Sequence, residues 1–174
     1  LNHLAKHLRS ASLKKKDAPF IHLHENDQLI SFEDFFQNAE KIASALISAG
    51  IRPGDRVAMQ VEKSSSALEL YFGTILAGAG FLPLNTAYVA EEIDFFLRDA
   101  RPSIFVCDPS KLDNYTKIAE SSGVSHIWTL SADGTGSLID AKNAEPPGFI
   151  GVKRNPDDLA AVLYTSGTTG RSKG

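Results

Sequence analysis

Leu159-Ala160-Ala161-Val162-Leu163-Tyr164 runs directly into Thr165-Ser166-Gly167-Thr168-Thr169-Gly170-Arg171-Ser172-Lys173-Gly174. The first part is short and continuously apolar, which favours a buried strand because helices usually need ten or more residues. The second part cannot be core, since it carries four hydroxyl side chains before Arg171, three glycines and Lys173. Glycines let backbone N–H groups turn inward, while hydroxyls and an ammonium group donate hydrogen bonds. The pattern predicts a strand followed by a loop that holds a polyphosphate.

Two widespread phosphate-binding motifs do not fit this chain. The Walker pattern, counted from Gly167, requires a glycine where Ser172 stands. The dinucleotide pattern G-x-G-x-x-G fails at the glycine pairs of 78–80 and 134–136, because proline and isoleucine occupy the third glycine position. A surface hairpin without a ligand is the plainer alternative. We disfavour it because ordinary turns do not need four hydroxyls and a lysine in one decapeptide.

The composition sets wide bounds on function. A chain of 174 residues with 43% apolar and 22% charged residues is expected to form one domain or part of one. A net charge of −3 gives no reason to expect a nucleic acid or a membrane as partner. Cys107 is the single cysteine and is expected to be a small buried core residue in a reducing compartment. Without a long apolar run or a signal-like N-terminus, we expect a cytoplasmic protein.

Strand and helix patterns alternate along the chain. We expect helices over 1–13, 32–50, 64–79, 91–100 and 108–120, and strands over 20–24, 29–31, 56–61, 103–107, 125–130 and 159–164. Pro83 places the short apolar segment 81–85 at an edge or a bend. Segment 131–158 is expected to be a surface loop with a brief helix at 138–144. The alternation predicts an α/β fold with a mostly parallel sheet flanked by helices.

Two polar clusters are expected to be solvated surface. His22 and His24 share one face of a strand at a spacing that a metal site could use, but no third ligand lies nearby in the sequence. Lys14-Lys15-Lys16 fits the exposed C-terminus of a helix better than a polyanion site.

The segment Tyr164–Gly174, read as Tyr-Thr-Ser-Gly-Thr-Thr-Gly-x-x-Lys-Gly, resembles the signature loop of the adenylate-forming (AMP-binding) superfamily. That superfamily contains acyl-CoA synthetases, adenylation domains of peptide synthetases and beetle luciferases. Further resemblance is carried, in the family's order, by segments 30–35, 50–57, 77–85 and 158–164. Within the superfamily, segments 84–88, 106–111 and 170–174 look most like malonyl-CoA synthetases. Ser172 stands where most members of the superfamily carry proline. This departure points toward the malonyl-CoA synthetases.

The resemblance implies an ATP-dependent acid–thiol ligase. A carboxylate, with malonate favoured, would attack MgATP to give an acyl-adenylate and pyrophosphate, and coenzyme A would then take the acyl group. The β- and γ-phosphates would be held by Thr165, Ser166, Gly167, Thr168, Thr169 and Lys173, with Gly170 supplying the bend. Tyr164 is expected to pack rather than react. No catalytic residue or metal ligand is expected within 1–174.

The resemblance also implies that 1–174 is a partial N-terminal domain ending at the phosphate loop 164–174. The sites for magnesium, ribose, the carboxylate and coenzyme A would then lie downstream, and the isolated chain would be inactive. Two alternatives stay open at this stage. One is a fragment of another adenylation enzyme, such as a peptide-synthetase adenylation domain or a different acyl-CoA synthetase. The other is a non-catalytic nucleotide-binding or interaction module.

Overall fold

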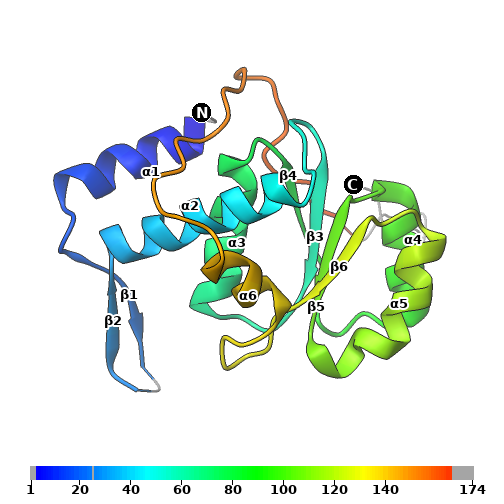
Figure 1. The fold of residues 1–174 in the computed structure, drawn as a ribbon. Coiled ribbons are helices and arrows are strands. Elements are labelled where there is room, and N and C mark those ends of the chain that lie inside the picture. The colour runs from blue at the N-terminus through cyan, green and yellow to red at the C-terminus, as the bar shows by residue number, and fades with distance from the viewer. Residues whose placement is uncertain (1–2, 25, 166–174) are drawn as a thin grey trace.

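Four parallel strands in the order β4-β3-β5-β6 form the central sheet (Figure 1). The strands are β3 (Arg56–Gln60), β4 (Gly80–Pro83), β5 (Ile104–Cys107) and β6 (His126–Thr129). The computed structural model describes residues 3–24 and 26–165. Every residue of β5 is buried, as expected for a strand whose two faces are both covered by helices. The predicted parallel α/β sheet is therefore confirmed.

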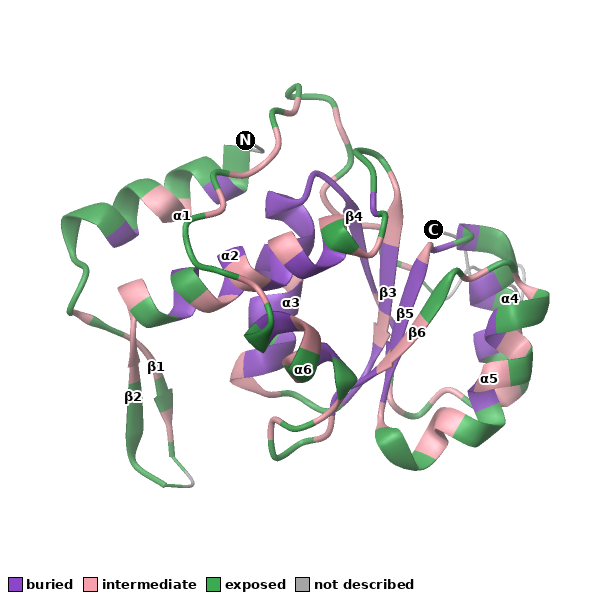
Figure 2. Cartoon of the chain, in the orientation of Figure 1, coloured by how far each residue is buried: buried purple, intermediate pink, exposed green. Residues whose placement is uncertain are grey.

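Helices cover both faces of this sheet (Figure 1). One layer consists of α2 (Phe32–Ser48), α3 (Ser65–Leu76) and α6 (Ser137–Asn143), and the other of α4 (Ala90–Ala100) and α5 (Leu112–Ser121), which follows a short 3-10 turn, η1 (Pro109–Lys111). The side chains of each strand alternate between the two resulting cores, because successive residues of a strand point to opposite faces. Figure 2 shows the buried residues gathered in the strands and on the helix faces turned toward them.

Helices α2 and α3 of the first layer begin where their capping residues predict. Ser31 Oγ accepts a hydrogen bond from Asp34 N at 3.0 Å, and Ser64 Oγ accepts one from Ala67 N at 3.1 Å. Each cap satisfies a backbone donor that the first turn of a helix leaves unpaired. Helix α3 ends at Leu76, three residues before the predicted Ala79, because the chain turns at Gly78, whose φ is +79°.

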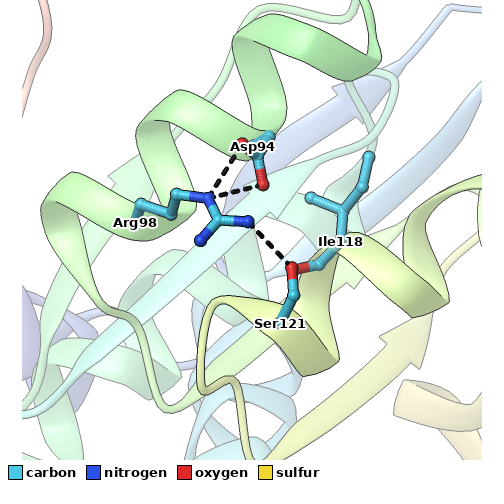
Figure 3. A network of polar contacts seen from close by, with 4 residues as sticks. All are labelled: Asp94, Arg98, Ile118 and Ser121. Atoms are coloured by element: carbon cyan, nitrogen blue, oxygen red, sulfur yellow. Dashed lines mark hydrogen bonds and ion pairs between the residues drawn. The ribbon is translucent and has the colours of Figure 1, made fainter.

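Helices α4 and α5 of the second layer are joined at their surface by a polar network (Figure 3). Arg98 Nε lies 2.8 Å from both carboxylate oxygens of Asp94, and Arg98 Nη2 donates to Ser121 Oγ at 3.1 Å. Ser121 Oγ in turn donates to the Ile118 carbonyl at 3.0 Å. The network is exposed, so water and salt weaken its contribution to stability.

The N-terminal part of the chain packs beside the first helical layer. Helix α1 (His3–Lys14) is followed by an antiparallel hairpin of β1 (Pro19–Leu23) and β2 (Gln28–Ser31), as predicted. Arg9 pairs with Glu40 on α2 at 3.0 Å and also donates to the Ile150 carbonyl at 2.9 Å. Burial raises the pKa of Glu40, while the charge of Arg9 lowers it. This one arginine ties α1 to α2 and to the long loop before the C-terminal segment.

The prediction of a buried strand over 159–164 is wrong in extent and in burial. Only Ala161 forms a bridge, parallel to Phe81 of β4, with Phe81 N donating to Ala160 O at 3.0 Å and Val162 N to Phe81 O at 2.9 Å. Leu159 and Leu163 are 59% and 63% exposed. The segment lies beside β4, where Val162 and Tyr164 pack against the second core while Leu159 and Leu163 remain exposed. Pro83, at the end of β4, fits the place of β4 at the edge of the four-stranded sheet, as its sequence predicted.

Candidate functional site

The segment assigned to phosphate binding is only partly described by the structure. Thr165 is described and exposed. Ser166, Gly167, Thr168, Thr169, Gly170 and Lys173 lie outside the described residues. Their assignment to the phosphates therefore stays a prediction. What the structure does show is how the chain is held where it enters this segment.

Tyr164, directly before Thr165, is held by helix α4. Its hydroxyl donates a hydrogen bond to the carboxylate of Asp99. Its ring centroid lies 4.7 Å from that of Phe96 and 6.5 Å from that of Phe95, distances typical of favourable aromatic pairs. Burial raises the pKa of the Tyr164 hydroxyl, and the hydrogen bond to Asp99 raises it further. Tyr164 is thus a neutral packing residue, as predicted.

Arg56 at the start of β3 brings a positive charge close to the same segment. Its guanidinium donates to the carbonyl of Ala100 at 2.8 Å, beside Asp99. Its charge lowers the pKa of Tyr164, against the stronger effects of burial and of Asp99. A cavity of about 350 Å³ opens here, with a lining that includes Arg56, Asp99, Val162 and Tyr164. The residues leading into segment 165–174 therefore meet both an aromatic contact from α4 and the polar side chains of Arg56 and Asp99.

Sequence reasoning did not find Asp99 and Arg56. In the sequence, Asp99 belongs to the predicted helix over 91–100, and Arg56 belongs to the predicted strand over 56–61 and to the family-like segment 50–57. The Tyr164–Asp99 contact joins residues 65 positions apart. No local periodicity or cap signals a pair of this kind, because the parallel crossovers that bring the two residues together are a property of the whole fold.

Segment 85–88 is bonded to the strand ends at the place where many open α/β sheets bind nucleotides. Such ligands bind outside the carboxyl ends of the strands where the strand order reverses, which here lies between β3 and β5. Gln60, fully buried at the end of β3, donates to the carbonyls of Asn85 and Tyr88 at 2.8 and 3.0 Å. Lys111 donates to the carbonyl of Thr86 at 3.0 Å. These bonds fix the 85–88 loop over the strand ends.

Cys107 at the end of β5 is a buried core residue, as predicted. Burial raises the pKa of its thiol to about 12, and the nearby charge of Asp108 acts in the same direction. A thiol that is not deprotonated near neutral pH is a poor nucleophile.

His22 pairs with Asp27 across the hairpin at 2.7 Å. Within residues 3–24 and 26–165, no three His, Cys, Asp or Glu side chains come close enough to hold a metal ion. A separate search of the same described residues finds no helix with the length and apolar character required to cross a membrane.

Comparison with known proteins gives matches along nearly the whole chain. The family model described as AMP-binding enzyme matches residues 8–174. Feruloyl-CoA synthase of an Amycolatopsis species is 33% identical over 153 residues, covering 83% of this chain and 27% of that protein. Enterobactin synthase component F of Escherichia coli K12 is 27% identical over 161 residues, covering 92% of this chain and 11% of that protein.

Solved structures agree with these sequence matches. The apo structure of MatB from Rhodopseudomonas palustris superimposes with a TM-score of 0.89 at 44% identity, covering all of this chain and 34% of MatB. The ATP-bound structure of MatB gives a TM-score of 0.86 at 46% identity, covering 96% of this chain and 33% of MatB. The chain thus spans about a third or less of the length of these proteins.

Proposed function

This chain belongs to the AMP-binding enzyme family, and on that ground we propose that it is the N-terminal part of an ATP-dependent acid–thiol ligase. The observation that carries the proposal is the family match over residues 8–174, which includes the glycine- and threonine-rich segment. The similarity to MatB, solved with ATP bound, supports ATP as the nucleotide. The assignment of 1–174 to part of the N-terminal domain and a cytoplasmic location belong to the same proposal.

The proposed reaction has two steps. A carboxylate oxygen attacks the α-phosphorus of ATP, and the bond to the β-phosphate bridging oxygen breaks, which gives an acyl-adenylate and pyrophosphate. The thiol of coenzyme A then loses its proton, its sulfur attacks the acyl carbonyl, and AMP leaves. The first step places additional negative charge on the leaving pyrophosphate, and preorganised donors aimed at that charge lower the barrier.

Segment 165–173 supplies such donors in this proposal. Thr165, Ser166, Thr168 and Thr169 offer hydroxyls, the glycines allow backbone N–H groups to face the phosphates, and Lys173 offers an ammonium charge. Magnesium would be held by groups outside residues 1–174. We also propose that residues 1–174 alone do not turn over. Acyl transfer needs the carboxylate and the thiol to be oriented against ATP, and the proposal assigns only phosphate-binding groups to this chain.

Malonate is the acid that we propose. It is supported by the resemblance of segments 84–88, 106–111 and 170–174 to malonyl-CoA synthetases and by the 44% identity with MatB. A second candidate is a ligase or adenylation domain for another acid, which the similarities to feruloyl-CoA synthase and to enterobactin synthase component F favour.

Acid-dependent ATP–pyrophosphate exchange tests the proposal. The assay uses the longer protein that contains residues 1–174, with malonate, acetate, ferulate and a long-chain fatty acid compared at equal concentration, and the 174-residue chain as control. We expect exchange with malonate in the longer protein and none in the control. Exchange with a different acid alone would replace malonate but keep the reaction class. Absence of exchange with every acid would contradict the ligase assignment.

A further inference from the structure

The entry into segment 165–174 is fixed by two separate parts of the fold. The backbone of 160–162 is bonded to Phe81 of β4 through two hydrogen bonds of 3.0 and 2.9 Å. The side chain of Tyr164 is bonded to Asp99 of α4. Leu163 and Thr165, on either side of Tyr164, are exposed. Tyr164 is therefore the last described residue whose side chain is tied to the body of the domain.

The contact of Tyr164 with α4 is suited to fixing the position of Tyr164 and not only to filling space in the core. The ring of Tyr164 lies against Phe96, an apolar contact that is less directional than a hydrogen bond. The hydrogen bond to Asp99 adds direction, because it requires the hydroxyl to meet one carboxylate with good geometry. Arg56 donates to the Ala100 carbonyl at 2.8 Å and lines the same cavity as Asp99.

We propose that Asp99 is a positioning residue for ATP binding: by accepting the hydroxyl of Tyr164, it fixes the point from which segment 165–174 extends. This inference rests on the proposed function, since it assumes that the segment binds the phosphates. Asp99 itself touches neither nucleotide nor acid in this proposal. Its effect reaches ATP through the single peptide unit that joins Tyr164 to Thr165. A small displacement of phosphate-binding donors is costly, since their benefit depends on prior orientation.

The test is steady-state ATP–pyrophosphate exchange by the longer protein with three substitutions. Tyr164→Phe keeps the ring and removes the donor, Asp99→Ala removes the acceptor, and Asp99→Asn keeps an acceptor oxygen. We expect the first two to raise the KM for ATP by about five- to tenfold, the effect of losing a hydrogen bond of typical net strength. Asp99→Asn should raise it less than about twofold, and the KM for the acid should not change in any variant. Combining Tyr164→Phe with Asp99→Ala should add little to either single change, because both remove the same bond.

Asp94→Asn is the matched control. Asp94 lies on the same helix as Asp99 but pairs with the exposed Arg98, which in turn bonds to Ser121 of α5 (Figure 3). It should leave the KM for ATP unchanged. A merely structural role for Asp99 would instead lower the amount of active enzyme, so that kcat falls while the KM for ATP stays constant. That result, or an equal rise in KM for Asp94→Asn, would overturn the inference.

Amide hydrogen exchange in the 174-residue chain separates this inference from the proposed function. The Val162 amide donates to Phe81 O. Its hydrogen should exchange faster in Tyr164→Phe, which lacks the hydroxyl, than in Asp94→Asn. Unchanged exchange would show that Asp99 does not anchor the segment, even if the longer protein is a ligase. Faster exchange in a longer protein without ligase activity would instead show that the anchor exists while the assigned function is wrong.

Discussion

Lys142 Nζ lies 3.2 Å from Glu69 Oε2, with 11% of the lysine side chain and 3% of the glutamate side chain exposed. The second carboxylate oxygen of Glu69 accepts a hydrogen bond from Asn38 Nδ2 at 2.9 Å. The three residues come from α6, α3 and α2, so this buried network fixes how the first helical layer is assembled. Each charge is tolerated away from water only because its partners are in place.

Lys142→Met should therefore destabilise the chain by about 3–5 kcal/mol, because it leaves the Glu69 carboxylate buried without its countercharge. Urea unfolding followed by circular dichroism measures the change. Replacing both partners, Glu69→Leu with Lys142→Met, should recover most of the loss, since no charge is then stranded. Arg98→Met, which removes an exposed ion pair, should leave the urea midpoint of unfolding unchanged. A loss of stability in the double variant as large as in Lys142→Met would contradict this account.

Gly73→Ala should also destabilise the fold, although alanine is the better helix former. A Cβ at this position would lie 2.7 Å from Ile42 Cγ2 and 3.0 Å from the Ala39 carbonyl oxygen, so α2 and α3 would have to move apart. Overpacking of this kind typically costs about 1–3 kcal/mol, more than the gain in helix propensity of about 1 kcal/mol.

Gly80→Ala is the control for the glycine in α3. A Cβ at Gly80 would meet its nearest neighbours at 3.8–4.0 Å, an ordinary contact. We expect a change in the free energy of unfolding of less than about 1 kcal/mol, measured in the same urea titration. If Gly73→Ala were as mild as Gly80→Ala, the close approach of α2 and α3 would not be a constraint on sequence.

The thiol of Cys107 should resist alkylation in the folded chain. Burial, followed by the charge of Asp108, raises its pKa to about 12, so the thiolate fraction at pH 8 is about one in ten thousand. Iodoacetamide labelling at pH 8 should be at least about a thousandfold slower than for a free thiol and should become fast in urea. Because the folded pKa exceeds the unfolded one, the thiol's contribution to stability is complete below about pH 9 and is lost as the pH rises toward 12. Rapid labelling without denaturant would show that Cys107 is reachable.

Most of the fold could be predicted from the sequence because its signals are local. The caps at Ser31 and Ser64 and the alternation of strand and helix patterns gave the elements and the parallel sheet. The exposed side of 159–164 could not be predicted in this way. A continuous apolar run specifies that a strand is suited to burial, but the number of its neighbours depends on its place in the sheet.

The assignment of 165–173 to the phosphates stays a prediction that rests on the sequence, because the hydroxyls, glycines and lysine fall within one stretch. The anchor of this stretch could not be recognised, since Asp99 meets Tyr164 only after the α4 crossover has brought the helix to the sheet's face. The same holds for Lys142 and Glu69, which are 73 positions apart.

Lys173→Ala in the longer protein tests the residue assignment at the phosphates. Under the proposed function, the ammonium group neutralises charge on the β- and γ-phosphates, and this charge grows as pyrophosphate leaves. Removing one preorganised donor of this type typically costs about 3 kcal/mol of barrier, which is about a hundredfold in rate. Malonate-dependent ATP–pyrophosphate exchange should fall by that factor, while Lys63→Ala, an exposed lysine before α3, should have no effect. The transfer of a pre-formed acyl-adenylate to coenzyme A should be affected far less, because pyrophosphate takes no part in that step. Exchange at the unsubstituted rate would remove Lys173 from the site and leave the hydroxyl and backbone groups of 165–170 as its donors.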